Sequence, residues 1–158
     1  MIRFIVIVVT AVLLNALPGL AAEPALEKPS ARDKCPVCGM FVAKYPDWVA
    51  AVVFKDGTRR YFDGPKDLFK FLLDLEQYAG GKRQSDIDRF SVTDYYAVRQ
   101  INGRLAFYVL GSDVYGPMGK ELIPFAGEAD AREFLKDHGA RRVLHFNDIT
   151  PAVLKELD

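Results

Sequence analysis

The sequence feature that most constrains the fold is an internal repeat, in which two stretches share a pattern of aromatic residues, glycine and leucine. The stretch "YFDGPKDLFKFL", which starts at Tyr61, aligns with "PFAGEADAREFL", which starts at Pro124. The alignment superposes Phe62 on Phe125, Gly64 on Gly127, Phe71 on Phe134 and Leu72 on Leu135. Each copy follows two strand-like segments and precedes a third, so it has strand-strand-helix-strand order. We therefore expect an α+β fold of two similar small units with mostly antiparallel sheets.

The first unit is predicted from a hairpin signal and an amphipathic pattern. Asp56 and Gly57 separate two strand-like segments, and this dipeptide favours a two-residue turn because glycine tolerates the required positive φ. Pro65 suits the first position of a helix whose apolar residues recur at the spacing of one buried face. The expected elements are strands at 47–54, 59–62 and 92–101 and a helix from 65 to the glycines at 80 and 81.

The second unit is predicted to begin at another hairpin turn, Asn102 and Gly103. The expected elements are strands at 104–110, 121–125 and 142–146, a helix at 128–138, and a last short helix capped by Thr150. Its first two strands are joined by a loop at 111–120, "GSDVYGPMGK", where the first unit has only a short turn. Because enlarged loops often carry function, this loop is a candidate for a binding site.

The N-terminus predicts an exported protein. Arg3, an apolar run and small residues after Pro18 are typical of a secretory signal peptide, which we place at 1–22. The run is shorter than the roughly 20 apolar residues of a transmembrane helix, so we expect no membrane span in the mature chain. No cysteine closely follows the run, so a periplasmic protein without a lipid anchor is expected. A flexible tether at 23–34, a first unit at 35–101 and a second unit at 102–158 would follow.

Composition excludes several classes of function. With 21 basic and 21 acidic residues, the chain has no excess positive charge to attract nucleic acid or an anionic membrane. Apolar residues make up 50% of the chain, which indicates a packed core. The sequence contains no recognisable set of nucleophile, base and orienting residue. We therefore expect a binding protein, no enzyme and no nucleic-acid partner.

Sulfur-containing residues concentrate in two short segments. "CPVCGM" holds Cys35, Cys38 and Met40, and "GPMG" in the long loop holds Met118. A methionine that fills a core lies on a helix or strand face, whereas both of these lie beside glycine in a turn context. Side chains two residues apart leave an extended segment on the same side, as at Cys38 and Met40. Thiolate and thioether ligands favour Cu(I) over zinc, magnesium or calcium, so these residues predict a copper site.

Three other interpretations of the cysteines stay open. In an exported protein Cys35 and Cys38 could form a disulfide, with the methionines merely at the surface. They could join His138 and His145 in a zinc site, although the six residues between the histidines exceed the usual spacing. They could also form a thiol-disulfide redox site, although such a motif normally follows a buried strand and opens a helix.

The histidines and one aspartate also have structural interpretations. His138 lies in the last turn of a predicted helix, where it can cap carbonyl groups and interact with the negative end of the helix dipole. His145 lies in a predicted strand. Asp63 directly precedes a predicted helix and is expected to serve its N-terminus. Either histidine remains a reserve ligand.

At these motifs the chain resembles the NosL family, copper-binding accessory proteins of nitrous oxide reductase maturation. The matching segments are "CPVCGM", "YFDGPKDLFKF" and above all "FYVLGSDVYGPMGKELIPFAGEADAREFLKDHG" at 107–139. The resemblance implies a pair of small α+β units that bind Cu(I) outside the cytoplasm. It also implies delivery of copper toward nitrous oxide reductase in denitrification, through a membrane-associated assembly machinery. The family's sulfur ligands would fall on Cys38, Met40 and Met118, with Cys35 and His138 as further candidates.

Overall fold

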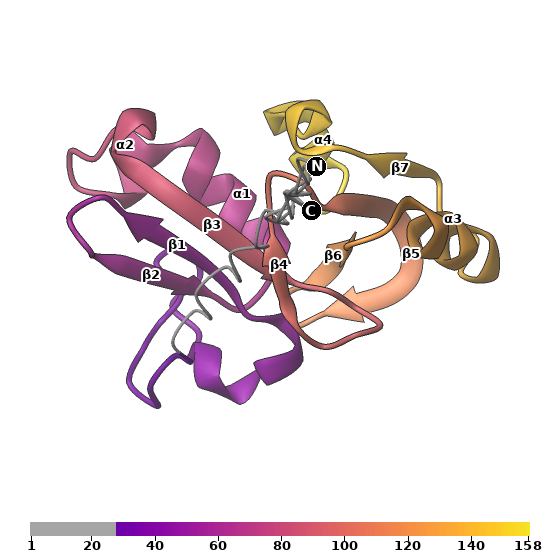
Figure 1. Ribbon diagram of the computed structural model, residues 1–158, viewed down its shortest axis with the longest axis horizontal. Helices are drawn as coiled ribbons and strands as arrows, with labels where there is room; N and C mark the ends of the chain where they lie inside the picture. Colours follow the sequence, from indigo (N-terminus) through magenta and orange to yellow (C-terminus); the bar gives the residue numbers. More distant parts are fainter. Residues whose placement is uncertain (1–27) are drawn as a thin grey trace, which may run out of the picture.

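The computed structural model describes residues 28–158, and the predicted signal peptide at 1–22 lies outside the described residues. Of the predicted tether, only residues 28–34 are described, and they contain a turn in which Asp33 N–H donates to the Ser30 carbonyl at 3.1 Å. Within the described range, no helix has both the length and the apolar character needed to cross a membrane. Figure 1 shows the two sheets side by side, with helices above them, between them and at the right-hand edge of the molecule.

The first unit forms a four-stranded antiparallel sheet with the strand order β2-β1-β3-β4. Its strands are β1 (Ala50–Phe54), β2 (Arg59–Phe62), β3 (Ile87–Thr93) and β4 (Gln100–Asn102). The helices between β2 and β3 are α1 (Pro65–Leu73) and α2 (Leu75–Tyr78). Gly57, with φ +81°, lies in the turn between β1 and β2, which confirms the predicted hairpin.

The second unit forms a three-stranded antiparallel sheet with the strand order β6-β5-β7. Its elements are β5 (Phe107–Gly116), β6 (Gly119–Phe125), α3 (Glu128–Asp137), β7 (Arg142–Leu144) and α4 (Pro151–Lys155). Four short 3-10 helices complete the described part: Val42–Lys44, Pro46–Trp48, Gln84–Asp86 and Phe146–Asp148. In both units the first strand is central, with the second and third strands on either side. The predicted α+β fold of two similar strand-strand-helix-strand units is confirmed.

The hairpin predicted at Asn102 and Gly103 is wrong, because the chain reverses earlier. The Asp94 side chain accepts backbone N–H groups of Tyr96 and Ala97 at 3.0 and 2.8 Å, and this caps a turn directly after β3. The segment after the turn, β4, pairs with β3, and β5 pairs with β6 and β7 instead. An aspartate that caps a turn thus outweighed the Asn-Gly signal.

The predicted long helix is divided at Asp74. Its backbone leaves the helical region, with φ −138° and ψ 66°, so α1 ends at Leu73. The Asp74 side chain then accepts the N–H of Gln77 at 3.1 Å, which caps α2. A good N-cap residue inside an apolar helical pattern explains the break.

The predicted loop at 111–120 is largely a β-hairpin. β5 continues to Gly116 and β6 begins at Gly119, so only Pro117 and Met118 form the turn. The strand register is irregular between Leu110 and Tyr115, which marks a bulge near the base of this extension. We call residues 115–120 the hairpin tip.

Helix α1 packs between the two units and contacts β1 and β2 of its own sheet, β6 of the other sheet, and α4. One face of the second sheet contributes Tyr108, Leu110 and Leu122 to this shared core. The opposite face, with Val109, Ile123 and Phe125, is covered by α3. Each face therefore has its own apolar cluster because strand side chains alternate.

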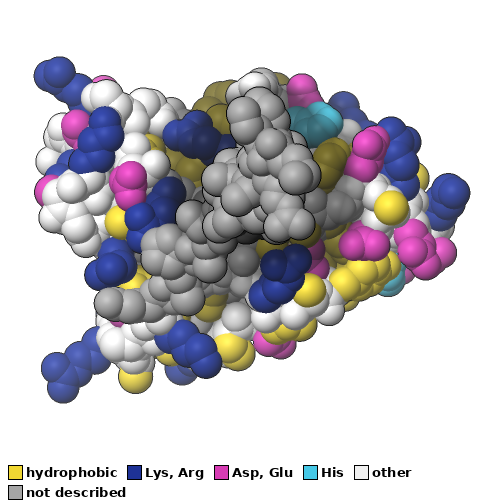
Figure 2. All heavy atoms as spheres, viewed as in Figure 1, with side chains coloured by type: hydrophobic (Ala, Val, Ile, Leu, Met, Phe, Trp, Pro, Cys, Tyr) yellow, Lys and Arg dark blue, Asp and Glu magenta, His cyan; other side chains and the backbone are white. Residues whose placement is uncertain are grey.

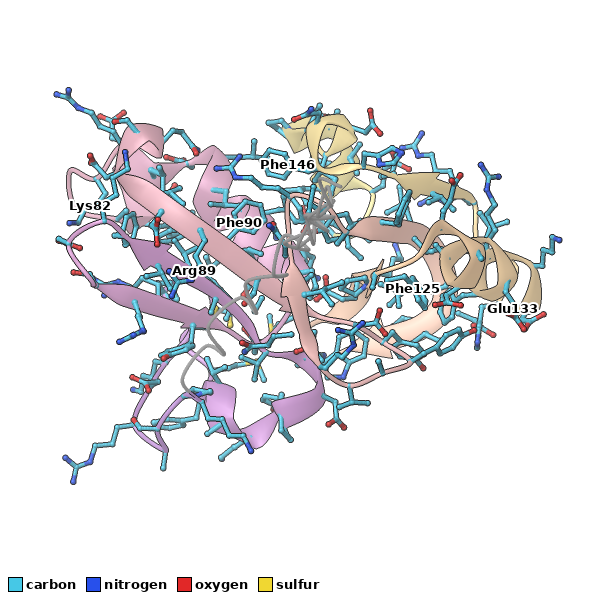
Figure 3. The ribbon with its side chains drawn as sticks, in the orientation of Figure 1. Lys82, Arg89, Phe90, Phe125, Glu133 and Phe146 are labelled. Atoms are coloured by element: carbon cyan, nitrogen blue, oxygen red, sulfur yellow. The ribbon has the colours of Figure 1, made fainter. Side chains whose placement is uncertain are left out.

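Aromatic side chains also join the units. Phe146, which follows β7, lies 5.2 Å from Phe90 of β3 and 6.0 Å from Phe69 of α1, measured between ring centroids. Figure 3 shows Phe90 and Phe146 close together between the two units. On the surface, Figure 2 shows basic and acidic side chains both spread over the face in view, as the balanced composition suggests.

Candidate metal centre

Two cysteines and two aspartates form a compact cluster. The Sγ atoms of Cys35 and Cys38 and one carboxylate oxygen each of Asp63 and Asp67 all lie within 4.8 Å of one another. We call these four residues the thiol-carboxylate cluster. Among the described residues, no further group of histidine, cysteine, aspartate and glutamate side chains meets this requirement for holding a metal ion.

A tight turn brings the two thiols together. Cys35 N–H donates to the Met40 carbonyl at 2.9 Å, and Gly39 N–H donates to the Cys35 carbonyl at 2.9 Å. Gly39 has φ +79°, a conformation that glycine adopts without the cost that a Cβ atom imposes. Both cysteines are free rather than disulfide-bonded.

The start of α1 supplies the carboxylates, Asp67 from its first turn and Asp63 from the residue before its N-cap, Gly64. Cys35 Sγ donates to Asp67 Oδ2 and Cys38 Sγ donates to Asp63 Oδ1, each at 3.2 Å. Asp63 is 1% exposed and Asp67 is 3% exposed, an uncommon degree of burial for acidic side chains without a cation. Asp63 Oδ2 is buried without a hydrogen-bond partner among the described residues. A buried, unpartnered carboxylate oxygen beside two thiols suits a metal ligand.

The expected role of Asp63 at the helix N-terminus needs correction. The N-cap of α1 is Gly64, which has no side chain to cap the helix, and the Asp63 oxygen Oδ1 faces Cys38 instead. The first free N–H of the helix, that of Lys66, is taken by Glu121 Oε1 at 2.6 Å. Asp63 is therefore available to the cluster.

Burial keeps both thiols protonated in the metal-free protein. It raises the pKa of Cys35 far above its ordinary value, and it raises the pKa of Cys38 to about 12. Backbone N–H groups oppose these rises, while the carboxyl groups of Asp63 and Asp67 add to them. A metal ion that binds thiolate must therefore displace thiol protons, so binding is coupled to pH.

The predicted methionines belong to two different segments that contact this region through their backbone carbonyls. Met40 is half-buried at the end of the cysteine turn. Met118 is 43% exposed at the hairpin tip, and its carbonyl accepts from Lys66 Nζ at 2.8 Å. Lys66 directly precedes Asp67, so the backbone of the hairpin tip contacts the helical turn that carries Asp67 of the cluster. Metal ligation by the two thioethers remains a prediction.

The histidines lie elsewhere. His138 Nδ1 is 2.8 Å from Asp113 Oδ1, and its ring stacks on Phe134 with centroids 4.1 Å apart. The ring of His145 lies 4.9 Å from that of Phe107. Neither histidine belongs to the thiol-carboxylate cluster, so the structure does not assemble the Cys2His2 set considered for zinc.

The two aspartates are the site residues that sequence reasoning missed. Their four-residue spacing across the start of a predicted helix, in "DGPKD", was the signal available. That spacing is also common on solvated helices, so the sequence could not reveal that both carboxylates are buried against cysteines.

Fold and cluster together define a class: small α+β proteins of two repeated units, with a candidate metal site of thiols and carboxylates where one helix begins. The chain belongs to the NosL family, because the model of this family, described as NosL, matches residues 26–154. The resemblance expected from the sequence is thereby confirmed.

Two relatives illustrate the match. The copper-binding lipoprotein NosL of Stutzerimonas stutzeri is 32% identical over 130 residues, which cover 78% of this chain and 65% of that protein. The crystal structure of the copper chaperone NosL from Shewanella denitrificans has a TM-score of 0.69 at 27% identity, and the match covers 83% of this chain and 99% of that one. The first relative is a lipoprotein, so it lends no support to the expectation that a lipid anchor is absent.

Proposed function

We propose that this protein binds Cu(I) outside the cytoplasm and acts as a metallochaperone, an accessory protein rather than an enzyme. The observation that carries the proposal is the pair of free thiols in the thiol-carboxylate cluster. Thiolate is a soft ligand that selects Cu(I), and Met40 and Met118 can add thioether sulfur. Relatives described as a copper-binding lipoprotein and a copper chaperone support the same metal.

The metal is proposed to enter as the thiol protons leave. Cys35 and Cys38 each donate a hydrogen bond to a buried carboxylate, so an acceptor lies directly beside each proton. When the thiolates bind Cu(I), these protons can pass through Asp67 and Asp63 to solvent. A monovalent ion held by two thiolates leaves one negative charge, and a Cu(I) site of low coordination number remains open to an incoming ligand.

Delivery is proposed to proceed from the side of Cys38. Cys35 is 1% exposed, whereas Cys38 is only partly buried. A ligand from the recipient can therefore reach the metal next to Cys38 and replace the protein's ligands one at a time. The proposed recipient is nitrous oxide reductase or a related copper enzyme in the periplasm, reached with a membrane-associated assembly machinery.

The experiment that tests this function is a Cu(I) titration of the reduced protein against a chromophoric chelator. We expect stoichiometric competition by the wild type, loss of competition in Cys38→Ser, and weakened competition in Met118→Ala. His145→Gln is the matched control, because His145 lies outside the cluster. Unchanged affinity in Cys38→Ser would contradict the proposed site.

A thiol-disulfide redox function has less support. Redox-active and nucleophilic cysteines have a lowered pKa, whereas burial and the neighbouring carboxylates raise the pKa of both thiols here. Dithiol oxidation without Cu(I) competition in the same titration would favour that alternative.

A further inference from the structure

Glu121 of β6 is a buried carboxyl group of the second unit that contacts the backbone of the first. It is 3% exposed, and its Oε1 accepts the N–H of Lys66 at 2.6 Å and that of Leu122 at 2.8 Å. The Lys66 contact joins residues 55 apart in sequence, between the units.

This contact caps α1 from outside its own unit. The first N–H groups of a helix have no partner within the helix and need an external acceptor. Here the N-cap residue Gly64 offers no side chain and Pro65 has no N–H, so the N–H of Lys66 is the first that needs an acceptor. Glu121 provides it through its Oε1 atom.

Two glycines, Gly64 and Gly116, leave room for the Glu121 side chain. A Cβ atom at Gly64 would clash with Glu121 Oε2, and one at Gly116 would lie 3.0 Å from Glu121 Cγ. The Glu121 side chain therefore lies wedged between the start of α1 and the end of β5, where the hairpin tip begins.

Lys66 provides a second connection in the reverse direction. Its side chain is 5% exposed, and its Nζ donates to the Met118 carbonyl at 2.8 Å. The β5-β6 hairpin is thus held at two points on one helical turn: Glu121, directly after the hairpin tip, binds the Lys66 backbone, and the Lys66 side chain binds the backbone of Met118 within the tip. The same turn includes Asp67, which accepts from Cys35.

We propose that Glu121 and Lys66 are positioning residues that hold the Met118 thioether next to the thiol-carboxylate cluster. The proposal rests on the Cu(I)-binding function proposed above. Neither residue needs to touch the metal, because each acts through the hairpin tip. Through these two residues, the metal site depends on how the second unit packs against the first.

The first test uses the metal-free protein and methyl-labelled methionine in an NMR spectrum. In Glu121→Leu, which keeps the bulk of the side chain without an acceptor, we expect the Met118 methyl signal to narrow and shift toward its position in an unfolded chain. The Met40 signal is the internal control and should stay in place, and Glu121→Gln, which keeps Oε1, should restore the Met118 signal. An unchanged Met118 signal, or equal changes at both methionines, would overturn the proposal.

The second test is a double-mutant cycle in Cu(I) affinity. We expect Glu121→Leu to weaken binding by about tenfold in the wild type, a size common for residues that act together, and to have little effect in a Met118→Ala background. Equal losses in both backgrounds would overturn the positioning role. If the wild type does not bind Cu(I) at all, the proposed function is wrong, and the methyl signals still decide whether Glu121 holds the hairpin tip.

Discussion

The two units share a topology but use their helices differently. In α1 seven residues are buried: Pro65, Lys66, Asp67, Leu68, Phe69, Phe71 and Leu72. In the longer α3 only Ala131 and Phe134 are buried. α1 packs on its own sheet with one side, and the second sheet and α4 cover its other side. α3 packs on its own sheet in the same way, but its other side faces solvent. Figure 3 shows Glu133 of α3 at the outer edge of the molecule.

The chemistry follows this difference in burial. By the repeat, Asp63 aligns with Ala126 and Asp67 aligns with Asp130. Asp67 is 3% exposed and faces a thiol, whereas Asp130 is exposed. The two units therefore share a fold, but among the described residues only the first unit has the candidate metal site, since that site depends on what packs against the start of the helix. The following four predictions test this contrast, from the largest expected effect to the smallest.

The largest effect is expected from pH, because only the first unit contains thiols. Because the pKa of Cys38 is about 12 and that of Cys35 is also raised, both cysteines are protonated in the metal-free protein at neutral pH. Since Cu(I) displaces these protons, apparent affinity should rise with pH, by about tenfold per pH unit for each thiol proton released. Chelator competition between pH 6 and pH 8 measures the slope. Cys35→Ser should halve it, and a slope of zero would mean that no thiolate binds the metal.

The second prediction compares aligned core residues. Phe71 and Phe134 are both fully buried, so replacing either by alanine should lower the free energy of unfolding by about 3 to 5 kcal/mol. Only Phe71→Ala should also weaken Cu(I) binding, because Phe71 belongs to the helix that carries the cluster. Urea unfolding monitored by circular dichroism, followed by Cu(I) competition, tests both statements. Equal losses of Cu(I) affinity would show that the units are not functionally distinct.

The third prediction compares aligned carboxylates. The carboxyl group of Asp67 contributes to the raised pKa of Cys38, after burial, so Asp67→Asn should lower that pKa. A fall of one pKa unit gives about ten times more thiolate at neutral pH and correspondingly faster alkylation by iodoacetamide. Asp130→Asn is the matched control and should leave the rate unchanged. An unchanged rate in Asp67→Asn would mean that the Asp67 carboxyl group does not contribute to the pKa of Cys38.

The smallest effect is expected on the surface of α3. Arg132 Nε donates to Glu128 Oε1 at 2.8 Å, and both side chains are largely exposed. Arg132→Ala should change the free energy of unfolding by less than about 0.5 kcal/mol, as is usual for exposed pairs one helical turn apart. It should not change Cu(I) affinity. A larger loss of unfolding free energy, measured by thermal unfolding, would show that surface ion pairs stabilise α3 more than expected for exposed side chains.

Local sequence patterns predicted most of the elements correctly. The dipeptide Asp56-Gly57 marked a true hairpin, and the helix expected at 128–138 corresponds to α3. The errors arose where polar residues compete with those patterns, as at Asp74, which caps a new helix, and at Asp94, which caps a turn. A side-chain cap involves only a few residues, so the sequence signal that it gives is weaker than that of an apolar repeat.

The sequence by itself determined the repeated order of strands and helices, the presence of Cys35 and Cys38 in one short segment, and membership of the NosL family. Only the tertiary structure decided that Asp63 and Asp67 face these cysteines and that Glu121 caps α1. The physical reason is the separation along the sequence over which each kind of interaction acts. Periodicity and turn chemistry operate between near neighbours, whereas burial of a carboxylate depends on which distant elements pack around it, and no local pattern encodes that packing.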